Sequence, residues 1–482
     1  MDREQFRKHA HEIVDWIADF YENIESYPVK AQVQPGEILG KLPGNIPETG
    51  EPFEAIMQDF TNIILPGITH WQHPSFFAYF PANTSFPSIL GEMLTAALGA
   101  QCMIWQTSPA AAELEERVLQ WLAEATGLPG DFEGVIQDSA STATLCALLS
   151  AREKVTAYAG NEKGLQRTVL QDDRTGAAGV LTAYCSTEAH SSVEKDVKIA
   201  GIGKENLRKV GVDESFAMVP EELDKAISRD RKDGCNPCIV VAAVGTTGST
   251  AIDPVRKIGE VCKKHGVWLH VDAALAGSAM VLDEHRWMID GLELADSYVF
   301  NPHKWLFTNF DCSAYFVRDR DTLIRTFSIL PEYLKTKEDN AVNNYRDWGV
   351  PLGRRFRALK LWFVLRSFGA EGLRRTIGSH MQWAQEFAGW VKQSDNFELL
   401  APVPLNTVCF RYLPPETTDN DEINRINGEL LEAVNATGSM YVTHTKLLGR
   451  YTLRLVVGQT SVERRHVVAA WELLQKTARS LG

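Results

Sequence analysis

The sequence predicts an α/β protein built on one large, mostly parallel β-sheet. From about residue 86 to residue 375, apolar runs of strand length alternate with windows of helical periodicity. The chain has 482 residues, of which 44% are hydrophobic and 23% charged, so it can bury a large core. It contains no internal repeat and no low-complexity tract. These observations together favour one large domain with smaller attachments.

The first predicted element is a helix over residues 2–24. Its apolar residues recur at helical spacing on one face, namely Phe6, Ala10, Ile13, Val14, Ile17, Tyr21 and Ile24. A stretch rich in proline and glycine follows over residues 28–52. The apolar face therefore has no core next to it in the sequence, and we expect the helix to dock elsewhere.

The strands of the predicted sheet follow in the central part of the chain. They are expected over residues 134–136, 179–184, 239–244, 267–271, 297–300 and 313–317, with helical windows such as 254–264 between several of them. The remainder, with a helix over 371–392, a strand over 407–411 and a terminal helix over 462–480, predicts a small α+β domain. The expected division is thus a helical segment (1–85), a large α/β domain (86–375) and a small C-terminal domain (376–482).

Charge and composition exclude several classes of function. The net charge of -13 argues against nucleic acid or an anionic membrane as a partner. No apolar run approaches the roughly 18 residues of a membrane span, and the N-terminus lacks a signal-peptide core. We therefore expect a soluble, cytoplasmic protein.

The eight cysteines are scattered singly except for Cys235 and Cys238, which form a C-x-x-C pair. Such a pair can be redox-active, but it normally opens a helix, and this one precedes a predicted strand. We interpret it as a loop that enters the strand. No second pair completes a zinc site, so no metal is expected.

The first candidate catalytic residue is Lys304. It lies in Asn301-Pro302-His303-Lys304-Trp305, between a proline-fixed turn and a bulky aromatic residue. Desolvation lowers the pKa of an ammonium group, and the resulting amine can attack a carbonyl to form an imine. The ordinary alternative is a surface lysine whose apolar stem covers the tryptophan.

A second signal favours the imine. The apolar run 267–271 ends at Asp272, and a buried carboxylate needs a cation, such as the ring nitrogen of pyridoxal phosphate (PLP). Ala274 is small enough to lie under a flat ring. Asp272 could instead cap the next helix. Because Lys304 and Asp272 both follow strands, we expect them to meet at the carboxyl edge of the sheet.

Residues 139–142, Ser-Ala-Ser-Thr, lie between a predicted strand and a predicted helix. Backbone N–H groups and hydroxyls at a helix start suit a phosphate group, although the same residues can serve as an ordinary N-cap. His190 stands in a short polar turn after the strand 179–184, and a lone histidine there is most often structural.

The predicted substrate pocket is aromatic. No lysine or arginine occurs between Lys41 and Arg117, a span that contains Trp71, Phe76, Phe77, Tyr79, Phe80, Met103 and Trp105. A pocket built from this span suits an aromatic side chain and offers no cation to an acidic one, although a basic residue could enter from elsewhere. The alternative is that these aromatic residues belong to the core.

Seven motifs stand in a fixed order along the chain. They are Gly67-Ile68-Thr69-His70-Trp71, Phe77-Ala78-Tyr79-Phe80-Pro81, Ile136-Gln137-Asp138-Ser139-Ala140-Ser141, Ala189-His190-Ser191-Ser192-Val193, His270-Val271-Asp272-Ala273-Ala274, Asn301-Pro302-His303-Lys304-Trp305 and Pro351-Leu352-Gly353-Arg354-Arg355-Phe356. In their order and spacing the chain resembles the group II PLP-dependent decarboxylases over its whole length, and among them the aromatic-L-amino-acid decarboxylases of the DOPA and tryptophan decarboxylase type.

This resemblance implies the fold type I of PLP-dependent transferases, with a sheet of the seven-stranded type, and a homodimer. The N-terminal segment would wrap the second subunit, and the active site would lie at the subunit interface. Lys304 would carry PLP, Asp272 would pair with the ring nitrogen and His190 would stack on the ring. The residues implied around the cofactor are Ser139, Ala140, Ser141, His190, Thr247, Asp272, Ala274, Asn301, His303 and Lys304.

The implied reaction is the decarboxylation of tryptophan, DOPA, tyrosine, phenylalanine or 5-hydroxytryptophan to an amine and CO2. The implied substrate contacts are Trp71, Tyr79, Phe80, Ala82, Gln101, Met103, His190 and Gly353. The family often has threonine in place of Ala82, tyrosine in place of Leu275, and an aliphatic and an aromatic residue in place of Gln101 and Met103. These differences leave the preferred substrate open.

Tyr333 is the expected proton donor. It lies in the mostly polar segment 330–340, which has the character of a mobile lid. Family members with phenylalanine here tend to make aldehydes with O2, so an aromatic aldehyde synthase is the alternative function. A decarboxylase for an acidic or basic substrate is disfavoured by the missing charges. A non-enzymatic scaffold is disfavoured because Lys304, Asp272, His190 and Tyr333 are all present.

Overall fold

The computed structural model describes residues 1–165, 179–329 and 341–481. Two compact units are present, and each is described by itself. The first contains residues 1–81, 385–400 and 408–482, and the second contains residues 82–384 and 401–407. The domain boundaries expected near residues 85 and 375 remain a prediction.

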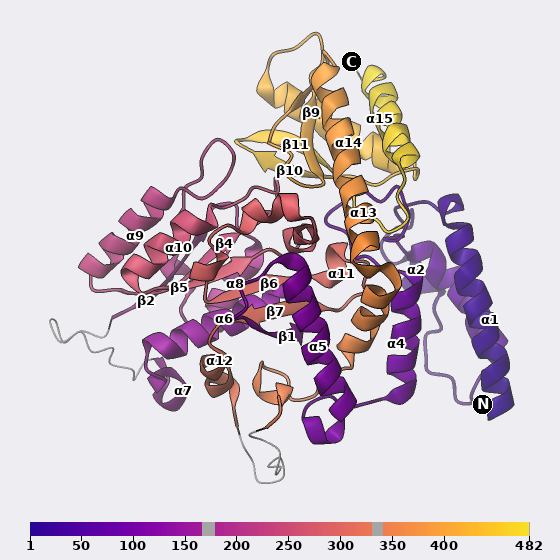
Figure 1. Cartoon of the computed structure of the whole chain (residues 1–482). Helices are drawn as coiled ribbons and strands as arrows, with labels where there is room; N and C mark the ends of the chain where they lie inside the picture. Colours follow the sequence, from indigo (N-terminus) through magenta and orange to yellow (C-terminus); the bar gives the residue numbers. More distant parts are fainter. Residues whose placement is uncertain (166–178, 330–340, 482) are drawn as a thin grey trace. The chain divides into compact units, whose positions relative to one another are not determined.

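The second unit contains a seven-stranded sheet in the order β1-β7-β6-β5-β4-β2-β3 (Figure 1). Its strands are β1 (Glu133–Gln137), β2 (Leu181–Ser186), β3 (Leu207–Val210), β4 (Asn236–Ala243), β5 (Trp268–Asp272), β6 (Ser297–Phe300) and β7 (Ser313–Val317). Neighbours from β3 to β6 pair in parallel, whereas β7 is antiparallel to both β6 and β1. The predicted mainly parallel sheet is confirmed, and each of the six predicted strands overlaps an observed one.

Helices cover both faces of this sheet. Successive side chains of each strand therefore point into two different apolar layers. One layer packs α6 (Ala140–Val155) and α8 (Ser191–Ile199) against Ala183, Cys185 and Val241. On the other face Tyr184 donates a hydrogen bond of 2.6 Å to Asp230 of α9 (Pro220–Lys232). The carboxyl edge of the parallel strands is left for the loops that follow β2, β4, β5 and β6.

The remaining helices of the second unit surround the sheet. They are α4 (Phe86–Leu98), α5 (Pro109–Thr126), α7 (Ala159–Lys163), α10 (Val255–His265), α11 (Pro302–Trp305), α12 (Arg320–Phe327) and the first part of α13 (Arg357–Gln393). Helix α13 is bent at Gly369, whose φ of 62° and ψ of 170° are non-helical. Glycine adopts a positive φ without steric cost, which explains why the bend falls there.

The first unit combines N-terminal helices with a four-stranded sheet in the order β10-β11-β9-β8. Its elements are α1 (Arg3–Glu22), α2 (Glu37–Lys41), α3 (Phe53–Asp59), β8 (Phe397–Leu399), β9 (Thr407–Tyr412), α14 (Asn420–Ala436), β10 (Thr443–Leu447), β11 (Arg450–Val456) and α15 (Arg464–Arg479). The predicted strand over 407–411 and terminal helix over 462–480 correspond to β9 and α15. The C-terminal part of the chain therefore forms the small sheet with helices that the sequence predicted.

Helix α1 makes local contacts, and the docking of its predicted apolar face elsewhere remains a prediction. Asp2 and Gln5 form a capping box at its start. Its contacts come from a face that the apolar pattern did not indicate: His9 lies 4.3 Å from Phe53, and Trp16 lies 5.1 Å from Phe60, between ring centroids. On the predicted face Phe6 remains 64% exposed, so part of that face is uncovered within the chain.

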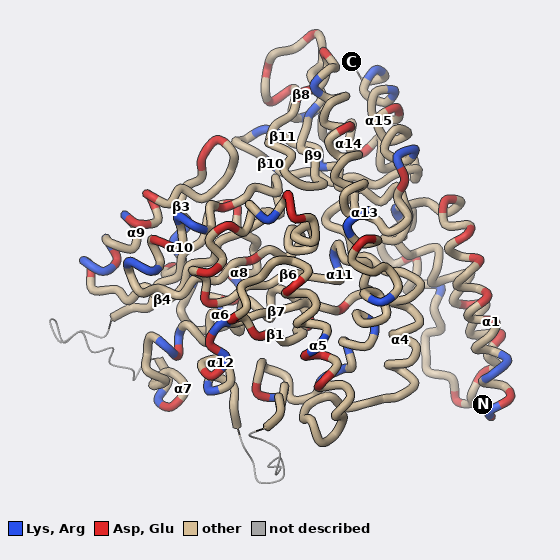
Figure 2. Tube along the Cα trace, viewed as in Figure 1, with Lys and Arg blue, Asp and Glu red and all other residues tan. Residues whose placement is uncertain are grey.

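The pair Cys235 and Cys238 differs slightly from the prediction, because β4 begins at Asn236 and already includes Cys238. All eight cysteines are free, and burial raises the pKa of the Cys238 thiol to about 12, which removes the chemistry of a reactive thiolate. Acidic and basic residues are interspersed along α1, α9 and α10 (Figure 2). Among the described residues, no helix combines the length and apolarity needed to cross a membrane.

Candidate functional site

The carboxyl edge of the central sheet brings together three of the predicted residues. Strand β5 ends at Asp272, helix α11 carries Lys304 directly after β6, and His190 stands at the start of α8 after β2. Burial lowers the pKa of Lys304, and the charge of Asp272 opposes this shift. Burial also lowers the pKa of His190, which Asp272 raises and Lys304 lowers. The three side chains thus share one electrostatic site, and the sequence had predicted that Lys304 and Asp272 would meet at this edge.

Asp272 serves partly as a local cap. Its Oδ1 accepts a hydrogen bond of 3.0 Å from the backbone N–H of Ala274, which is the alternative role that the sequence left open. A carboxylate has acceptor capacity for several donors, so this bond leaves room for a cationic partner. Capping and charge pairing are therefore compatible at Asp272.

His190 is the N-cap residue of α8. Its Nδ1 accepts a 3.2 Å hydrogen bond from the backbone N–H of Ser192 and also lies 2.8 Å from the Ser192 hydroxyl. His190 as a whole residue is exposed, although its imidazole is partly desolvated. The cap fixes the imidazole while one ring face and Nε2 stay available to a neighbouring group.

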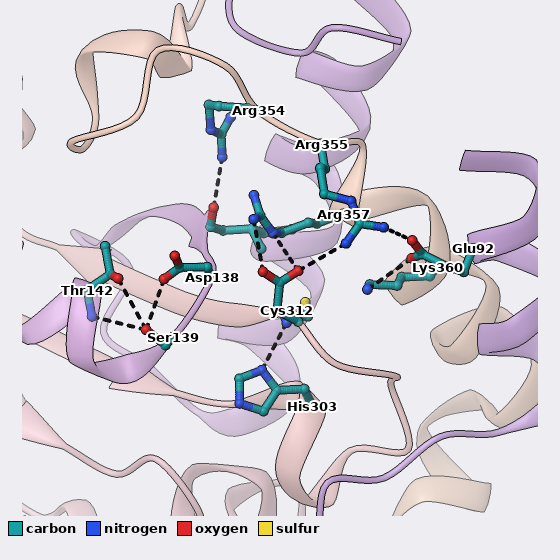
Figure 3. A network of polar contacts seen from close by, with 12 residues as sticks. Glu92, Asp138, Ser139, Thr142, His303, Cys312, Arg354, Arg355, Arg357 and Lys360 are labelled. Atoms are coloured by element: carbon teal, nitrogen blue, oxygen red, sulfur yellow. Dashed lines mark hydrogen bonds and ion pairs between the residues drawn. The ribbon is translucent and has the colours of Figure 1, made fainter. Parts of the chain in front are cut away.

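The start of α6 has the geometry of an anion site. Ser139 is its N-cap, and its Oγ accepts a 3.2 Å hydrogen bond from the backbone N–H of Thr142 and donates to Asp138 at 2.9 Å (Figure 3). The Ser139 hydroxyl is thus used as an ordinary cap. The N–H groups at the start of the 16-residue helix α6, with the Ser141 hydroxyl, remain the suitable donors for phosphate.

Asn301 and His303 flank the lysine and are both buried, at 2% and 3% exposure. The Nδ1 of His303 accepts a 2.9 Å hydrogen bond from the backbone N–H of Cys312 (Figure 3). Burial lowers the pKa of His303 to about 3, so its ring is neutral near pH 7. Asn301 Oδ1 accepts a 2.6 Å hydrogen bond from the Ser313 hydroxyl.

Three predicted substrate residues lie in the first unit, where they form an aromatic group with Tyr441. Trp71 and Tyr79 are stacked with centroids 5.7 Å apart, and the hydroxyls of Tyr79 and Tyr441 are 3.2 Å apart. Trp71 is 38% and Tyr79 48% exposed, so these two are not core residues. Phe80 is half-buried, with the Arg454 guanidinium 5.4 Å from its ring centroid.

Arg454 bears on the prediction that the substrate pocket offers no cation to an acidic substrate. It is a basic residue that enters the aromatic group from β11, far from residues 41–117 in the sequence. It is 4% exposed and its Nη1 donates a 3.3 Å hydrogen bond to Thr443 Oγ1, which also accepts from the backbone N–H of Tyr79 at 3.2 Å. Arg454 is engaged with the wall of this group rather than exposed to a ligand.

The other predicted substrate residues, Ala82, Gln101, Met103 and Gly353, lie in loops of the second unit. Gln101 Oε1 accepts a 2.7 Å hydrogen bond from the backbone N–H of Arg354, which supports a structural role for this glutamine. A Cβ added at Gly353 would lie 3.2 Å from Gln101 Nε2. The loops that carry Gln101 and Gly353 are therefore packed together.

The roles of two predicted residues, Thr247 and Tyr333, remain predictions. Thr247 follows β4 and is exposed, while the neighbouring Thr246 is buried and its Oγ1 accepts from the backbone N–H of Ala251 at 3.0 Å. Tyr333 lies outside the described residues, so its role as proton donor remains a prediction.

Sequence reasoning missed a set of buried charges behind the site. Arg354 and Glu115 form an ion pair of 2.6 Å with side chains 5% and 3% exposed. Arg357 holds Asp311 with two hydrogen bonds of 3.0 Å, and Lys360, which is fully buried, lies 3.0 Å from Glu92 (Figure 3). The available signal was the dense basic run Arg354, Arg355, Arg357 and Lys360, which directly follows Gly353.

The residues present fit PLP. Asn301 Nδ2 and His303 Nε2 are donors without a protein partner among residues 1–165, 179–329 and 341–481, and they stand next to the lysine. The donor set of N–H groups, hydroxyl, amide and neutral imidazole suits a phosphate, and Asp272 suits a cationic ring nitrogen. A lysine with a lowered pKa suits an aldehyde.

Comparison with known proteins gives consistent matches. A family model described as the pyridoxal-dependent decarboxylase conserved domain matches residues 35–413. Phenylacetaldehyde synthase of Arabidopsis thaliana is 45% identical over 488 residues, covering 99% of this chain and 96% of that protein. Tyrosine decarboxylase 2 of Narcissus pseudonarcissus is 43% identical over 488 residues, covering 99% and 95%. The crystal structure of Oryza sativa TDC with PLP and tryptamine superimposes with a TM-score of 0.94 at 36% identity, covering 100% and 99%.

Proposed function

Because the chain belongs to the pyridoxal-dependent decarboxylase family, whose cofactor is PLP, we propose that it converts aromatic L-amino acids to arylalkylamines and CO2. The candidate substrates are tryptophan, DOPA, tyrosine, phenylalanine and 5-hydroxytryptophan. The observation that carries the proposal is the meeting of Lys304, Asp272 and His190 at one edge of the sheet, where Asp272 raises the pKa of both Lys304 and His190 and Lys304 lowers that of His190. The full-length similarity to a tyrosine decarboxylase supports the aromatic substrate class.

Each side chain has a role in this proposal. PLP, when bound, supplies an electron-withdrawing ring that accepts the electron pair released when a bond to Cα breaks. The Lys304 amine, deprotonated more easily because of its burial, would hold the cofactor through its aldehyde. The Asp272 carboxylate would stabilise a protonated ring nitrogen, and the imidazole of His190, held by its bond to the Ser192 N–H, would contact the ring.

Substrate contacts are proposed within each unit separately: the aromatic group in the first unit, and the loops that carry Gln101 and Gly353 in the second. Trp71 and Tyr79 provide exposed ring faces, and Phe80 provides a wall backed by Arg454. Burial and the neighbouring Tyr79 raise the pKa of Tyr441 to about 12, so the Tyr441 phenol is neutral and can bond a ring hydroxyl. A poorly solvated substrate carboxylate would be lost more readily as CO2.

We assign the final proton transfer to Tyr333. After CO2 leaves, Cα must gain a proton, and a phenol can donate it. His190, in contact with the same site, is the next candidate for this step. The alternative function, an aromatic aldehyde synthase, consumes O2 and water and releases aldehyde, ammonia, peroxide and CO2. Its specific support is the 45% identity to phenylacetaldehyde synthase.

We further propose a homodimer with the active site at the subunit interface. Helix α4 exposes an apolar face at helical spacing, with Phe86, Leu90, Met93, Leu94 and Leu98 each at least 40% exposed. On α1, Phe6 and Val14 are also exposed. A second copy of the chain would cover these faces. A cytoplasmic location remains part of the proposal.

An amino-acid panel tests the function. The purified holoenzyme is incubated with each aromatic L-amino acid and with glutamate, and amine, aldehyde, CO2 and peroxide are measured together. We expect equimolar amine and CO2 from at least one aromatic substrate and no turnover of glutamate. Equimolar aldehyde and peroxide from wild type would instead establish the synthase. In the first case, Tyr333→Phe should divert product toward aldehyde and peroxide, and unchanged amine output from this variant would remove Tyr333 from the mechanism.

A further inference from the structure

Two consecutive residues, Cys312 and the first residue of β7, Ser313, determine which atoms of Asn301 and His303 can donate hydrogen bonds at the proposed phosphate site. Cys312 donates its backbone N–H to His303 Nδ1 at 2.9 Å, and Ser313 donates its hydroxyl to Asn301 Oδ1 at 2.6 Å. Both acceptor atoms are thereby occupied. A neutral imidazole whose Nδ1 accepts carries its proton on Nε2, and an amide whose oxygen accepts has its NH2 group left to donate.

The backbone reinforces this arrangement. His303 donates its own N–H to the Cys312 carbonyl at 3.2 Å, so residue 312 holds residue 303 from both sides. The carbonyl of His303 in turn accepts from the Asn83 N–H at 3.0 Å, and Asn301 N–H donates to the Ala274 carbonyl at 2.9 Å. The ring and the amide are therefore fixed in position as well as in polarity.

The segment that contains Cys312 and Ser313 is itself clamped. Arg357 of α13 donates from Nε and Nη2 to the two carboxylate oxygens of Asp311, each at 3.0 Å. Arg355 bridges Asp311 and Glu92 (Figure 3). Burial raises the pKa of Asp311, but the hydrogen bonds and charge of Arg357 outweigh it, so the pKa falls below its usual value and the carboxylate stays ionised. A bidentate pair of this kind restricts both partners.

We propose that residues 311–313, clamped by Arg357, are an orienting segment that presents Asn301 and His303 as hydrogen-bond donors to a phosphate monoester dianion. Ser313, Asp311 and Arg357 are positioning residues, since they act through Asn301 and His303. This inference rests on the proposed function, because it takes the phosphate of PLP as the ligand. It explains how neutral side chains can hold a dianion: none of their acceptor atoms faces it.

The test compares PLP with pyridoxal, which has the same ring and aldehyde but no phosphate. Full-length holoenzyme is dialysed to equilibrium against graded concentrations of either compound, and bound cofactor is read from its visible absorbance. In Ser313→Ala the Asn301 amide loses the bond that fixes its orientation. We expect the Kd for PLP to rise about tenfold, the worth of one hydrogen bond to a charged group, and the Kd for pyridoxal to change less than about twofold. Ser313→Thr, which keeps the hydroxyl, should restore PLP binding.

Matched controls separate this effect from general damage. Ser297→Ala removes another buried serine hydroxyl, which bonds Trp268 and His270 at 2.9 Å each, at the opposite end of the sheet. Arg357→Gln is compared with Arg256→Gln, which breaks a bidentate pair with Asp290 on the surface. We expect Arg357→Gln to weaken PLP selectively and both controls to bind like wild type.

The outcomes are distinguishable. An equal loss of PLP and pyridoxal affinity in Ser313→Ala and Arg357→Gln would overturn the orienting role, because the damage would not depend on phosphate. Unchanged PLP affinity in both variants would overturn it as well. If wild type binds neither compound saturably, the proposed function itself fails, and the inference fails with it. In folded holoenzyme, the 31P resonance of bound PLP should shift in Ser313→Ala and not in Ser297→Ala.

Discussion

Glu115→Gln probes the buried ion pair that joins three segments of the second unit. Glu115 Oε1 accepts from Arg354 Nη2 at 2.6 Å and from the Ile136 backbone N–H at 2.8 Å. Arg354 Nη2 also donates to the Ile136 carbonyl at 2.8 Å. Arg354 Nη1 is buried without a hydrogen-bond acceptor among the described residues, so the guanidinium depends on Glu115 for compensation.

The expected loss of folding stability in Glu115→Gln follows from the burial of the ion pair. Glutamine keeps the shape of Glu115 and one acceptor, but it leaves the Arg354 charge unpaired in a site with 5% and 3% exposed side chains. Removing one partner of a buried ion pair costs about 3–5 kcal/mol of folding stability. Because glutamine keeps the shape of glutamate, we expect Glu115→Gln to lose about 3 kcal/mol, at the lower end of this range. The second unit has about 310 residues, and an unfolding entropy of about 2.1 cal/mol/K per residue then predicts a fall in Tm of about 5 °C.

Thermal unfolding followed by circular dichroism measures this loss. Glu116→Gln is the matched control, because Glu116 is the next residue on α5, carries the same chemical change and is exposed. We expect it to change Tm by less than about 1 °C, since exposed pairs contribute little. The double variant Glu115→Gln/Arg354→Met should recover stability relative to Glu115→Gln alone, because no unpaired charge remains. A fall in Tm that is the same for Glu115→Gln and Glu116→Gln would refute the reasoning.

Two further predictions concern carboxylates near the cofactor edge. Asp272→Ala should fold and bind PLP but lose most decarboxylation, since the ring nitrogen loses its counter-ion; near-normal turnover would contradict the pairing role. Burial raises the pKa of Asp196 from 3.8 to about 7, and its Oδ2 has no hydrogen-bond partner among the described residues. Protonation of Asp196 thus favours the folded state, whose stability falls as the pH rises from about 4 to about 7. Asp196→Asn should gain stability over wild type across that range in urea unfolding and keep a constant gain above pH 7; a gain independent of pH would refute this.

The sequence predicted the part of the fold that has a strong local signal. The central strands β4, β5, β6 and β7 are long or continuous runs of apolar residues buried on both faces, so their pattern is visible without tertiary contacts. The edge strand β3 has only four residues, with Arg208 and Lys209 in its middle. Because this run is short and polar at its centre, the strand was not predicted. β8 has three residues and β10 alternates buried and exposed positions only weakly, so both were missed.

The site was predictable where its residues follow strands directly. Asp272, Lys304 and His190 each come after a strand of the same parallel sheet, and topology alone brings them to one edge. The contacts that orient them were not predictable. Arg354 and Glu115 are 239 residues apart in the sequence, and Arg357 and Asp311 are 46 apart, so no local pattern connects either pair. Arg454 reaches Phe80 through the pairing of β10 and β11, which periodicity did not reveal.

Mapping the cofactor attachment tests the central claim most directly. The holoenzyme is reduced with borohydride and digested, and the peptide that carries the pyridoxyl phosphate mass is sequenced by tandem mass spectrometry. We predict loss of the visible absorbance band and a single modified residue, Lys304, with no modified peptide from Lys304→Ala. Lys360, the other lysine of this region with a pKa lowered by burial, to about 8, is the internal control and should remain unmodified. Attachment at Lys360, or at any lysine other than Lys304, would contradict the account.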